Sequence, residues 1–370
     1  MIYLDNSATT KTFDEVKKYL TEIMDIFGNP SSVHSLGLEA EQIIKKNRKI
    51  VADSFDVSES EVYFTSCATE SNNTAILGVA YANLKRGKHL ITSKIEHPSV
   101  LEVFKKLELE GFRVTYLDVD SNGIIDLNQF ATEIDDETTL VSIMAVNNEI
   151  GSIQPIDKIM AYKRKYNFTM HVDAVQGYLK IPMNTIKKAD IISISGHKFN
   201  AIKGIGALII KKGTKIKPLI VGGGQESDFR SGTENILGIA AMGKAVDVTK
   251  SLSHNSDLRE IIVDGLKDID GVSFNGYNEG NSSPYILSMS TKGIRGEVLL
   301  HLLEQKGVYV STGSACHSNK FGLSHVLNAI GLDRNTAGST IRISLGSITT
   351  EEEVRKATEI IKESINELRR

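Results

Sequence analysis

Short apolar runs of strand length alternate with longer amphipathic runs from about residue 60 of this chain onward. The apolar runs are rich in β-branched residues and mostly lack polar alternation, which is typical of strands buried on both faces. We expect strands at residues 62–66, 89–93, 113–119, 139–146, 169–175, 191–195 and 206–210. Helical patterns lie between or before them, for example at residues 38–55 and 70–84, and together they predict an α/β core with a largely parallel sheet.

The pattern changes after about residue 250. Strand-like pieces at residues 285–291, 308–313 and 340–345 flank a helix expected at residues 295–306. A last helix is expected from Thr350, which has capping-box spacing to Glu353. The apolar stripe of this helix consists of Val354, Ala357, Ile361 and Ile365. We therefore predict a large domain over residues 12–252 and a smaller α+β domain formed by residues 1–11 and 253–370.

Composition argues against several classes of protein. The net charge is only −3 and no long run of one sign occurs, so direct binding to nucleic acid or to an anionic membrane is not expected. The two cysteines, Cys67 and Cys316, lie far apart, which predicts neither a disulfide framework nor a thiolate metal site. Such cysteine usage fits a reducing compartment. The N-terminus lacks the basic start and apolar run of a signal peptide, and we expect a cytoplasmic protein.

Residues 65–70 stand where a predicted strand gives way to a helix. Small residues there can leave backbone N–H groups free at a helix N-terminus, where an anion such as phosphate is favoured. The alternative is an ordinary N-cap by Ser66 or Thr69. Cys67 in this segment is expected to be a small buried hydrophobic residue.

Two further motifs follow predicted strands. Asp173 ends an apolar strand, where it would either face a ligand crevice, and in a pyridoxal phosphate (PLP) enzyme pair with the ring nitrogen, or cap the next turn. Lys198 follows the next strand, and a desolvated lysine there can form a Schiff base, although most lysines are solvated surface residues. Ser195 and His197, beside Lys198, are candidate phosphate contacts.

Three more positions are candidate site residues. His97 follows a strand and could stack on a ring and move protons, or simply be satisfied by backbone. Cys316 lies in a polar, glycine-containing loop, where a thiol is either a nucleophile or a tolerated free cysteine. Arg342 interrupts an apolar strand, so its charge needs either a substrate carboxylate or an internal ion pair.

Taken in this order, the motifs resemble those of the NifS/IscS-type cysteine desulfurases, a branch of the class V, fold-type-I PLP enzymes. The resemblance covers essentially the whole chain. It is carried by Asp173-Ala174-Val175-Gln176, Ser195-Gly196-His197-Lys198, Arg230-Ser231-Gly232-Thr233-Glu234-Asn235 and Gly313-Ser314-Ala315-Cys316, with further matches at residues 3–10, 27–32 and 146–151. It implies a large domain with a mostly parallel seven-stranded sheet and a smaller α+β domain.

The resemblance also implies roles for individual residues. Lys198 matches the lysine that binds PLP covalently, and Asp173 matches the partner of the pyridine nitrogen. Gln176 matches the hydrogen-bond partner of the ring hydroxyl, with Asn148 nearby. His97 matches the acid/base that stacks on the ring. The phosphate-binding residues are matched by Ala68, Thr69, Ser195 and His197.

The remaining implied roles concern substrate, sulfur and partners. Arg342 matches the anchor of the substrate carboxylate, and Cys316 matches the nucleophile that becomes a persulfide. Thr233 matches a phosphate contact from a second subunit, which implies a homodimer with shared active sites. The implied reaction converts L-cysteine to L-alanine and passes sulfur to an iron–sulfur scaffold or a tRNA sulfurtransferase. Another class V PLP activity, an aminotransferase or a selenocysteine lyase-like enzyme, is the alternative.

Overall fold

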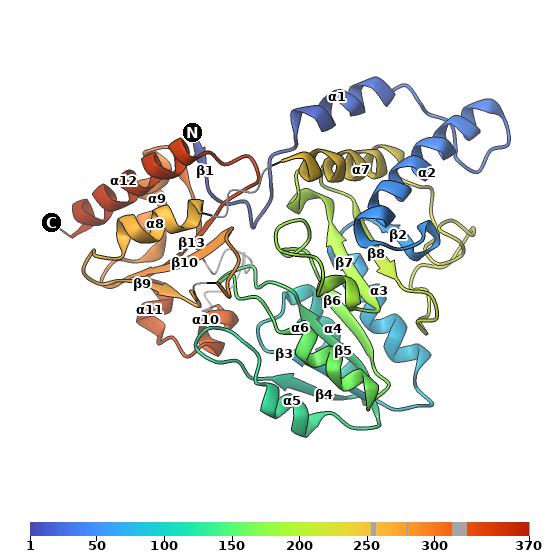
Figure 1. Cartoon of the computed structure of the whole chain (residues 1–370), viewed down its shortest axis with the longest axis horizontal. Helices are drawn as coiled ribbons and strands as arrows, with labels where there is room; N and C mark the ends of the chain where they lie inside the picture. Colours follow the sequence, from blue (N-terminus) through green and yellow to red (C-terminus); the bar gives the residue numbers. More distant parts are fainter. Residues whose placement is uncertain (253–256, 279, 313–323, 370) are drawn as a thin grey trace.

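The computed structural model describes residues 1–252, 257–278, 280–312 and 324–369. Its largest sheet has seven strands in the order β2-β8-β7-β6-β5-β3-β4 (Figure 1). The strands are β2 (Val62–Thr65), β3 (His89–Ser93), β4 (Arg113–Leu117), β5 (Thr138–Met144), β6 (Thr169–Asp173), β7 (Ile191–Ser195) and β8 (Gly206–Ile210). Only β8 runs against the others in this sheet, since it pairs antiparallel with β7 and with β2. The prediction of a mostly parallel seven-stranded sheet is confirmed.

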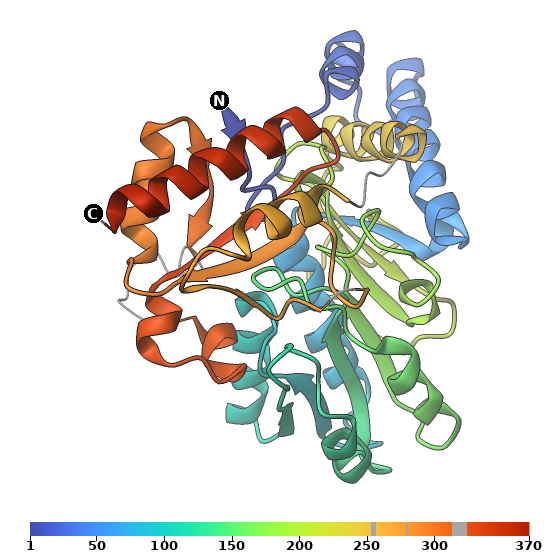
Figure 2. The same cartoon turned by 60° about the vertical axis from the view of Figure 1, so that its left-hand side comes forward.

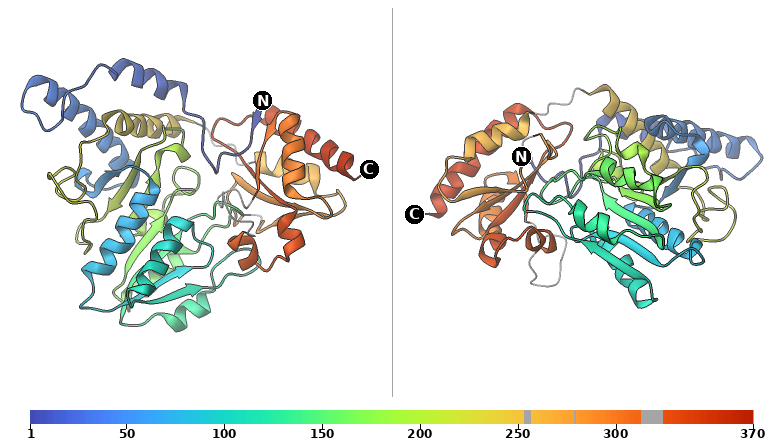
Figure 3. Two further views of the ribbon diagram at one scale, coloured as in Figure 1. Left: turned by 180° about the vertical axis from the view of Figure 1, so that it is seen from behind. Right: turned by 60° about the horizontal axis from the view of Figure 1, so that its bottom comes forward.

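Helices cover both faces of this sheet. Successive side chains of β3 point to opposite faces of the sheet, and both faces are buried. Leu90 packs among α3 and α4, and Ile91 packs in the core that includes α2 and α7. These helices, with the neighbouring α1, α5 and α6, are α1 (Asp14–Ile23), α2 (Ser35–Phe55), α3 (Ala68–Ala82), α4 (Pro98–Leu109), α5 (Leu127–Glu133), α6 (Ile156–Met160) and α7 (Ile236–Ser251). In the left view of Figure 3, which shows the molecule from behind, α3 and α4 lie in front of the sheet.

A second, antiparallel sheet has the order β12-β13-β10-β9. Its strands are β9 (Val272–Asn275), β10 (Ile286–Thr291), β12 (Ser311–Thr312) and β13 (Thr340–Ser344). Three helices pack on its apolar face, namely α8 (Leu258–Leu266), α9 (Gly296–Gln305) and α12 (Glu351–Leu368). The short helices α10 (His325–Ala329) and α11 (Arg334–Gly338) complete this part. The predicted domain boundaries stay a prediction.

The N-terminus lies beside this second part of the chain. β1 (Ile2–Tyr3) pairs in parallel with β11 (Val308–Tyr309), which brings the first residues next to α12 (Figure 2). Short 3₁₀ segments occur at Glu59–Glu61, Ala161–Arg164, Ile186–Lys188 and Gly196–Lys198, the last called η4. Among the described residues, no helix combines the length and the apolarity needed to span a bilayer.

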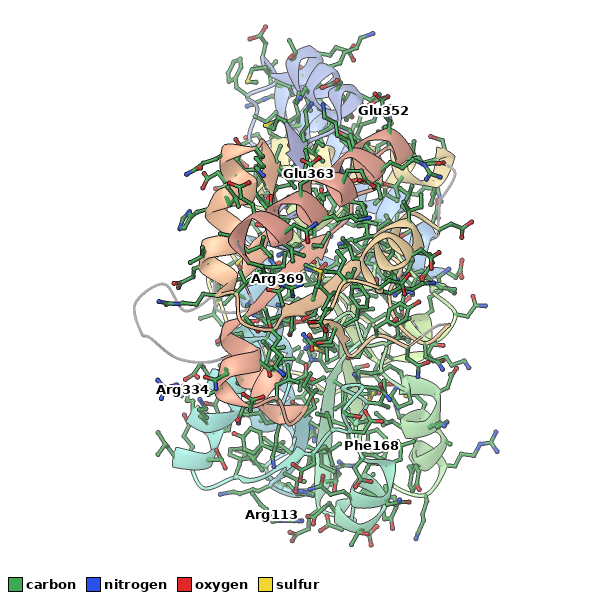
Figure 4. All side chains as sticks on the ribbon, turned by 90° about the vertical axis from the view of Figure 1, so that its left-hand side faces the viewer. Arg113, Phe168, Arg334, Glu352, Glu363 and Arg369 are labelled. Atoms are coloured by element: carbon green, nitrogen blue, oxygen red, sulfur yellow. The ribbon has the colours of Figure 1, made fainter. Side chains whose placement is uncertain are left out.

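The last helix matches its sequence signal. Thr350 Oγ1 accepts the backbone N–H of Glu353, whose carboxylate accepts the N–H of Thr350, so the capping box is confirmed. The four residues of the predicted apolar stripe are all buried. Figure 4 shows Glu352 and Glu363 on this helix, and both are exposed.

Several predicted strands are too long by a few residues. The strands expected at residues 113–119 and 169–175 end at Leu117 and Asp173, because the chain turns out of the sheet there to form loops. The strand expected at residues 308–313 is two strands, since β11 pairs with β1 while β12 pairs with β13. Gly313 lies outside the described residues.

Candidate active site

A cavity of about 320 Å³ lies at the carboxyl ends of β5, β6 and β7, beside the N-terminus of α3. This edge of a parallel sheet is where α/β enzymes bind their ligands. The predicted site residues that line the cavity are Ala68, Thr69, His97, Asn148, Asp173, Gln176, Ser195, His197, Lys198 and Arg342. They come from distant parts of the sequence, and the fold brings them together.

The start of α3 is open to an anion. Its N-cap residue is Cys67, which makes no side-chain capping hydrogen bond, so the alternative of a cap by Ser66 or Thr69 is wrong. The Ser66 N–H is taken up by a carboxylate oxygen of Glu70 at 2.8 Å. Cys67 is half-buried and lines the cavity, so the expectation of a small buried hydrophobic residue is also wrong. The reason is its place in the turn before the helix, outside the packed face.

Ser195, at the end of β7, also faces this cavity. Its Oγ is buried and has no hydrogen-bond partner among the described residues. A buried hydroxyl without a partner is costly unless a ligand satisfies it. Together with the uncapped start of α3, it suits the oxygens of a phosphate group.

Asp173 is buried at the end of β6 and is held from two sides. Oδ2 accepts a hydrogen bond from Nδ2 of Asn72 at 2.8 Å, and Oδ1 accepts one from the N–H of Val175 at 3.0 Å. The turn-capping alternative is therefore present, and the carboxylate also lines the cavity; its pairing with a ring nitrogen stays a prediction. These contacts fix the carboxylate in one orientation.

Lys198 lies in η4, directly after β7, and reaches the N-terminal segment. Its Nζ donates hydrogen bonds to the backbone carbonyl oxygens of Ser7 and Ala8, the second at 2.9 Å. The alternative of a solvated surface lysine is wrong, since the side chain lines the cavity. Sequence reasoning gave no role to Ser7 or Ala8, although both belong to a matched string.

Gln176 is oriented by a second lysine. Its Nε2 donates to the carbonyl oxygen of Ser7 at 2.9 Å, and its Oε1 accepts from Nζ of Lys180 at 2.8 Å. Burial, together with the smaller effects of the positive charges of Lys198 and Arg342, lowers the pKa of Lys180 to about 7. Sequence reasoning missed Lys180, which the four-residue spacing from Gln176 could have suggested.

Two histidines line the cavity, and the pKa of each is lowered. His97 is the N-cap of α4, and burial lowers its pKa even though Asp173 is nearby; the charges of Lys198 and His325 act in the same direction. Burial likewise lowers the pKa of His197 to about 4, with Lys198 again contributing. His197 Nδ1 lies 3.1 Å from the hydroxyl oxygen of Thr9.

Arg342, on β13, comes from the second sheet and is buried. Its Nη2 pairs with Oδ1 of Asp5 at 2.8 Å, and its Nη1 donates to the carbonyl oxygen of Asn148 at 3.1 Å. The internal ion pair is therefore present. Nε has no partner among the described residues, so the guanidinium retains a donor beside the cavity.

Two predicted site residues are not placed in the cavity. Thr233 is exposed and is not among the described lining residues. Cys316 lies outside the described residues, between Thr312 of β12 and Ser324. Beyond it, Ser324 hydrogen-bonds the carboxylate of Glu149, and His325 Nε2 lies 2.9 Å from the carbonyl oxygen of Glu96. The described part of the chain that begins at Ser324 therefore lies next to Asn148 and His97, which line the cavity.

Comparison with known proteins identifies the family of the chain. The family model described as aminotransferase class-V matches residues 2–356. The chain belongs to this family. A cysteine desulfurase IscS from Methanosarcina thermophila is 42% identical over 375 residues, which cover 100% of this chain and 93% of that protein. A solved NifS-like protein is 41% identical with a TM-score of 0.91, and the match covers 99% of both chains.

A third relative is a solved complex with cysteine. The solved structure called SspA in complex with cysteine is 34% identical, has a TM-score of 0.84, and matches over 95% of this chain and 100% of that one. Full-length similarity at this level places the chain among the cysteine desulfurases, which are PLP-dependent enzymes of the class-V aminotransferase family.

The cavity residues fit PLP. Lys198 offers an amine, Asp173 offers a buried carboxylate, and Ser195 with the uncapped start of α3 offers donors for a phosphate. The cavity volume of about 320 Å³ is at the lower end of the range for sites that hold small ligands.

Proposed function

We propose that this enzyme takes sulfur from L-cysteine, releases L-alanine, and carries the sulfur as a persulfide on Cys316. The observation that carries the proposal is the convergence of Lys198, Asp173 and Arg342 on one cavity, in a chain similar over its full length to cysteine desulfurases. The reaction balances because the substrate sulfur moves to the Cys316 thiol and the remaining carbon takes up a proton.

Different residues of the cavity contact different parts of the cofactor. When bound, PLP supplies an electron sink for the charge that develops at the substrate Cα. Lys198 binds the cofactor covalently through Nζ and takes the Cα proton when it is released. Asp173 holds a proton on the pyridine nitrogen, since a buried carboxylate favours a positive partner.

Other residues hold the ends of the cofactor. Gln176 and Asn148 would hydrogen-bond the ring hydroxyl, and His97 would stack on the ring. The phosphate contacts come from Ala68, Thr69, Ser195 and His197. The donor groups at the start of α3 support this assignment.

The substrate and its sulfur involve two further residues. Arg342 binds the carboxylate of L-cysteine through the donor that its ion pair with Asp5 leaves over. The Cys316 thiolate attacks the substrate sulfur, and the carbon–sulfur electron pair stays on the departing carbon fragment, which is protonated to give alanine. We assign the acid/base role in this protonation to His97, which lines the cavity.

The partners are proposed on chemical grounds. We propose a homodimer in which Thr233 contacts the phosphate in the partner's site, since Thr233 is exposed on its own chain. The sulfur acceptor is a protein thiol of an iron–sulfur scaffold or of a tRNA sulfurtransferase. A cytoplasmic location stays a prediction of the sequence.

Covalent cofactor attachment tests the assignment of Lys198. Borohydride reduction of the purified enzyme, followed by peptide mass spectrometry, is expected to find the cofactor mass on the peptide that contains Lys198. Lys198→Ala is expected to lack any attached cofactor, because no amine replaces Nζ. Lys203→Ala is a matched control, since Lys203 is an exposed lysine a few residues along the chain. Attachment to another lysine would contradict the proposal.

A further inference from the structure

Asn72 joins two residues of the site that are far apart in the sequence. It is fully buried on α3. Its Nδ2 donates to Oδ2 of Asp173 at 2.8 Å and to Oγ of Ser99 at 2.9 Å. Both amide hydrogens are therefore used, and a flipped amide would bring its oxygen against the Asp173 carboxylate. The orientation of Asn72 is fixed by this contact.

The hydrogen bond from Asn72 determines how the Ser99 hydroxyl bonds to His97. Because Ser99 Oγ accepts from Asn72, its own hydrogen is directed to Nδ1 of His97, 2.8 Å away. The backbone N–H of Ser99 also points at this nitrogen, at 3.1 Å. An N–H group can only donate, so Nδ1 of His97 must be an unprotonated acceptor. The neutral ring then carries its hydrogen on Nε2.

The second ring nitrogen of His97, Nε2, lies on the side of the cavity. His97 lines the cavity, and no hydrogen bond joins Nε2 to any residue in the described part of the chain. A doubly protonated ring is disfavoured, since a hydrogen on Nδ1 would face the Ser99 N–H. Burial and the charges of Lys198 and His325 oppose protonation too, against the opposite effect of Asp173.

We propose that Asn72 and Ser99 are positioning residues that hold His97 as a neutral ring with its hydrogen on Nε2. In this arrangement His97 offers the cavity a hydrogen-bond donor and carries no positive charge. The link also ties the ring of His97 to Asp173, so the two residues keep one mutual orientation. This inference rests on the proposed function, in which His97 faces the cofactor and the substrate.

Nitrogen NMR of the holoenzyme labelled with ¹⁵N-histidine tests the inference, with His97→Gln used to assign the signals of His97. The expected spectrum shows a protonated Nε2 and an unprotonated Nδ1 between about pH 6 and 8. A charged ring in this range, or a hydrogen on Nδ1, would overturn the inference. This measurement needs no turnover, so a lack of desulfurase activity would count only against the proposed function.

Variants of Ser99 give a second readout. Ser99→Ala removes the hydroxyl that bonds Nδ1 but keeps the backbone N–H, so the hydrogen should stay on Nε2 while the Nδ1 signal shifts and kcat falls about tenfold, the effect of losing one hydrogen bond. Ser99→Thr keeps the hydroxyl and should restore both. The control is Ser142→Ala, which removes a buried serine bonded to Nδ1 of His171 at 2.7 Å, and it should leave the His97 signals unchanged. A Ser99→Ala enzyme with unaltered signals and kcat would contradict the inference.

Discussion

Glu96 is a buried acid directly beside His97. Its Oε1 accepts hydrogen bonds from Ser93 Oγ at 2.6 Å and from the N–H of Met144 at 3.1 Å, while Oε2 has no partner among the described residues. Burial raises the pKa of Glu96 from 4.5 to about 8. At neutral pH the folded enzyme therefore keeps this carboxyl protonated, which avoids an unpaired buried charge.

This shift predicts a pH-dependent stability. Between about pH 4.5 and 8 the folded state binds the Glu96 proton and the unfolded state has lost it, so the free energy of unfolding falls as pH rises through this window. Glu96→Gln keeps the acceptor oxygen and does not titrate. We expect the variant to lack this fall, which is on the order of a few kcal/mol.

Urea unfolding of both proteins from pH 5 to about 9 measures the effect. The wild type and Glu96→Gln should be closest in stability at the acid end and should separate toward the alkaline end, with the variant the more stable. Parallel stability curves would show that Glu96 titrates normally in the folded enzyme.

At the scale of elements, β8 determines where α3 begins. A Cβ atom on Gly206 would lie 2.7 Å from the backbone carbonyl carbon of Cys67 and 2.7 Å from Oγ1 of Thr65. The backbone of β8 therefore presses on the turn that leads into α3. Only a residue without a side chain permits this approach, and the approach places the N–H groups at the start of the helix.

Gly206→Ala is expected to shift this turn and weaken phosphate binding. Overpacking of this kind costs about 1–3 kcal/mol, equal to roughly a tenfold to hundredfold weaker affinity for PLP if it falls on that site. Titration of the apoenzyme with PLP, followed by absorbance, gives the affinity. Gly338→Ala is the control, because nothing lies within 4 Å of its added Cβ. Equal affinities in the two variants would exclude this role for Gly206.

The elements were largely predictable because their signals are local. The apolar runs of the large sheet and the spacing of Thr350 and Glu353 depend on neighbours in the sequence. The contacts of Lys198 with Ser7 and Ala8 join residues some 190 positions apart, so no local pattern reports them. Cys67 was misjudged for the same reason, since its exposure depends on which elements surround the turn.

At the scale of the whole molecule, the first ten residues connect the two sheets at the cavity. Strand β1 pairs with β11, and Asp5 pairs with Arg342 of the second sheet. A few residues later, the carbonyl oxygens of Ser7 and Ala8 hold Lys198 of the first sheet. The N-terminal segment therefore contacts both the lysine proposed to bind the cofactor and the arginine proposed to bind the substrate.

The proposed homodimer is a prediction at this scale. Phe27, Val33 and Val221 are 81%, 94% and 77% exposed, as expected of residues that a second chain would cover. Sedimentation should give twice the chain mass of 40.6 kDa. Mixed refolding of Lys198→Ala chains with Thr233→Ala chains should exceed the activity of either alone, because one site of each mixed dimer is intact. A monomeric enzyme, or no gain on mixing, would contradict shared sites.

The central claim is that sulfur passes from L-cysteine to Cys316. The most direct test is to measure sulfide and alanine formed from L-cysteine in the presence of a reductant, for the wild type and for Cys316→Ala. We predict equal amounts of both products from the wild type and neither from the variant, with PLP still bound. Undiminished product formation by Cys316→Ala would contradict the claim and would favour another PLP reaction in the same cavity.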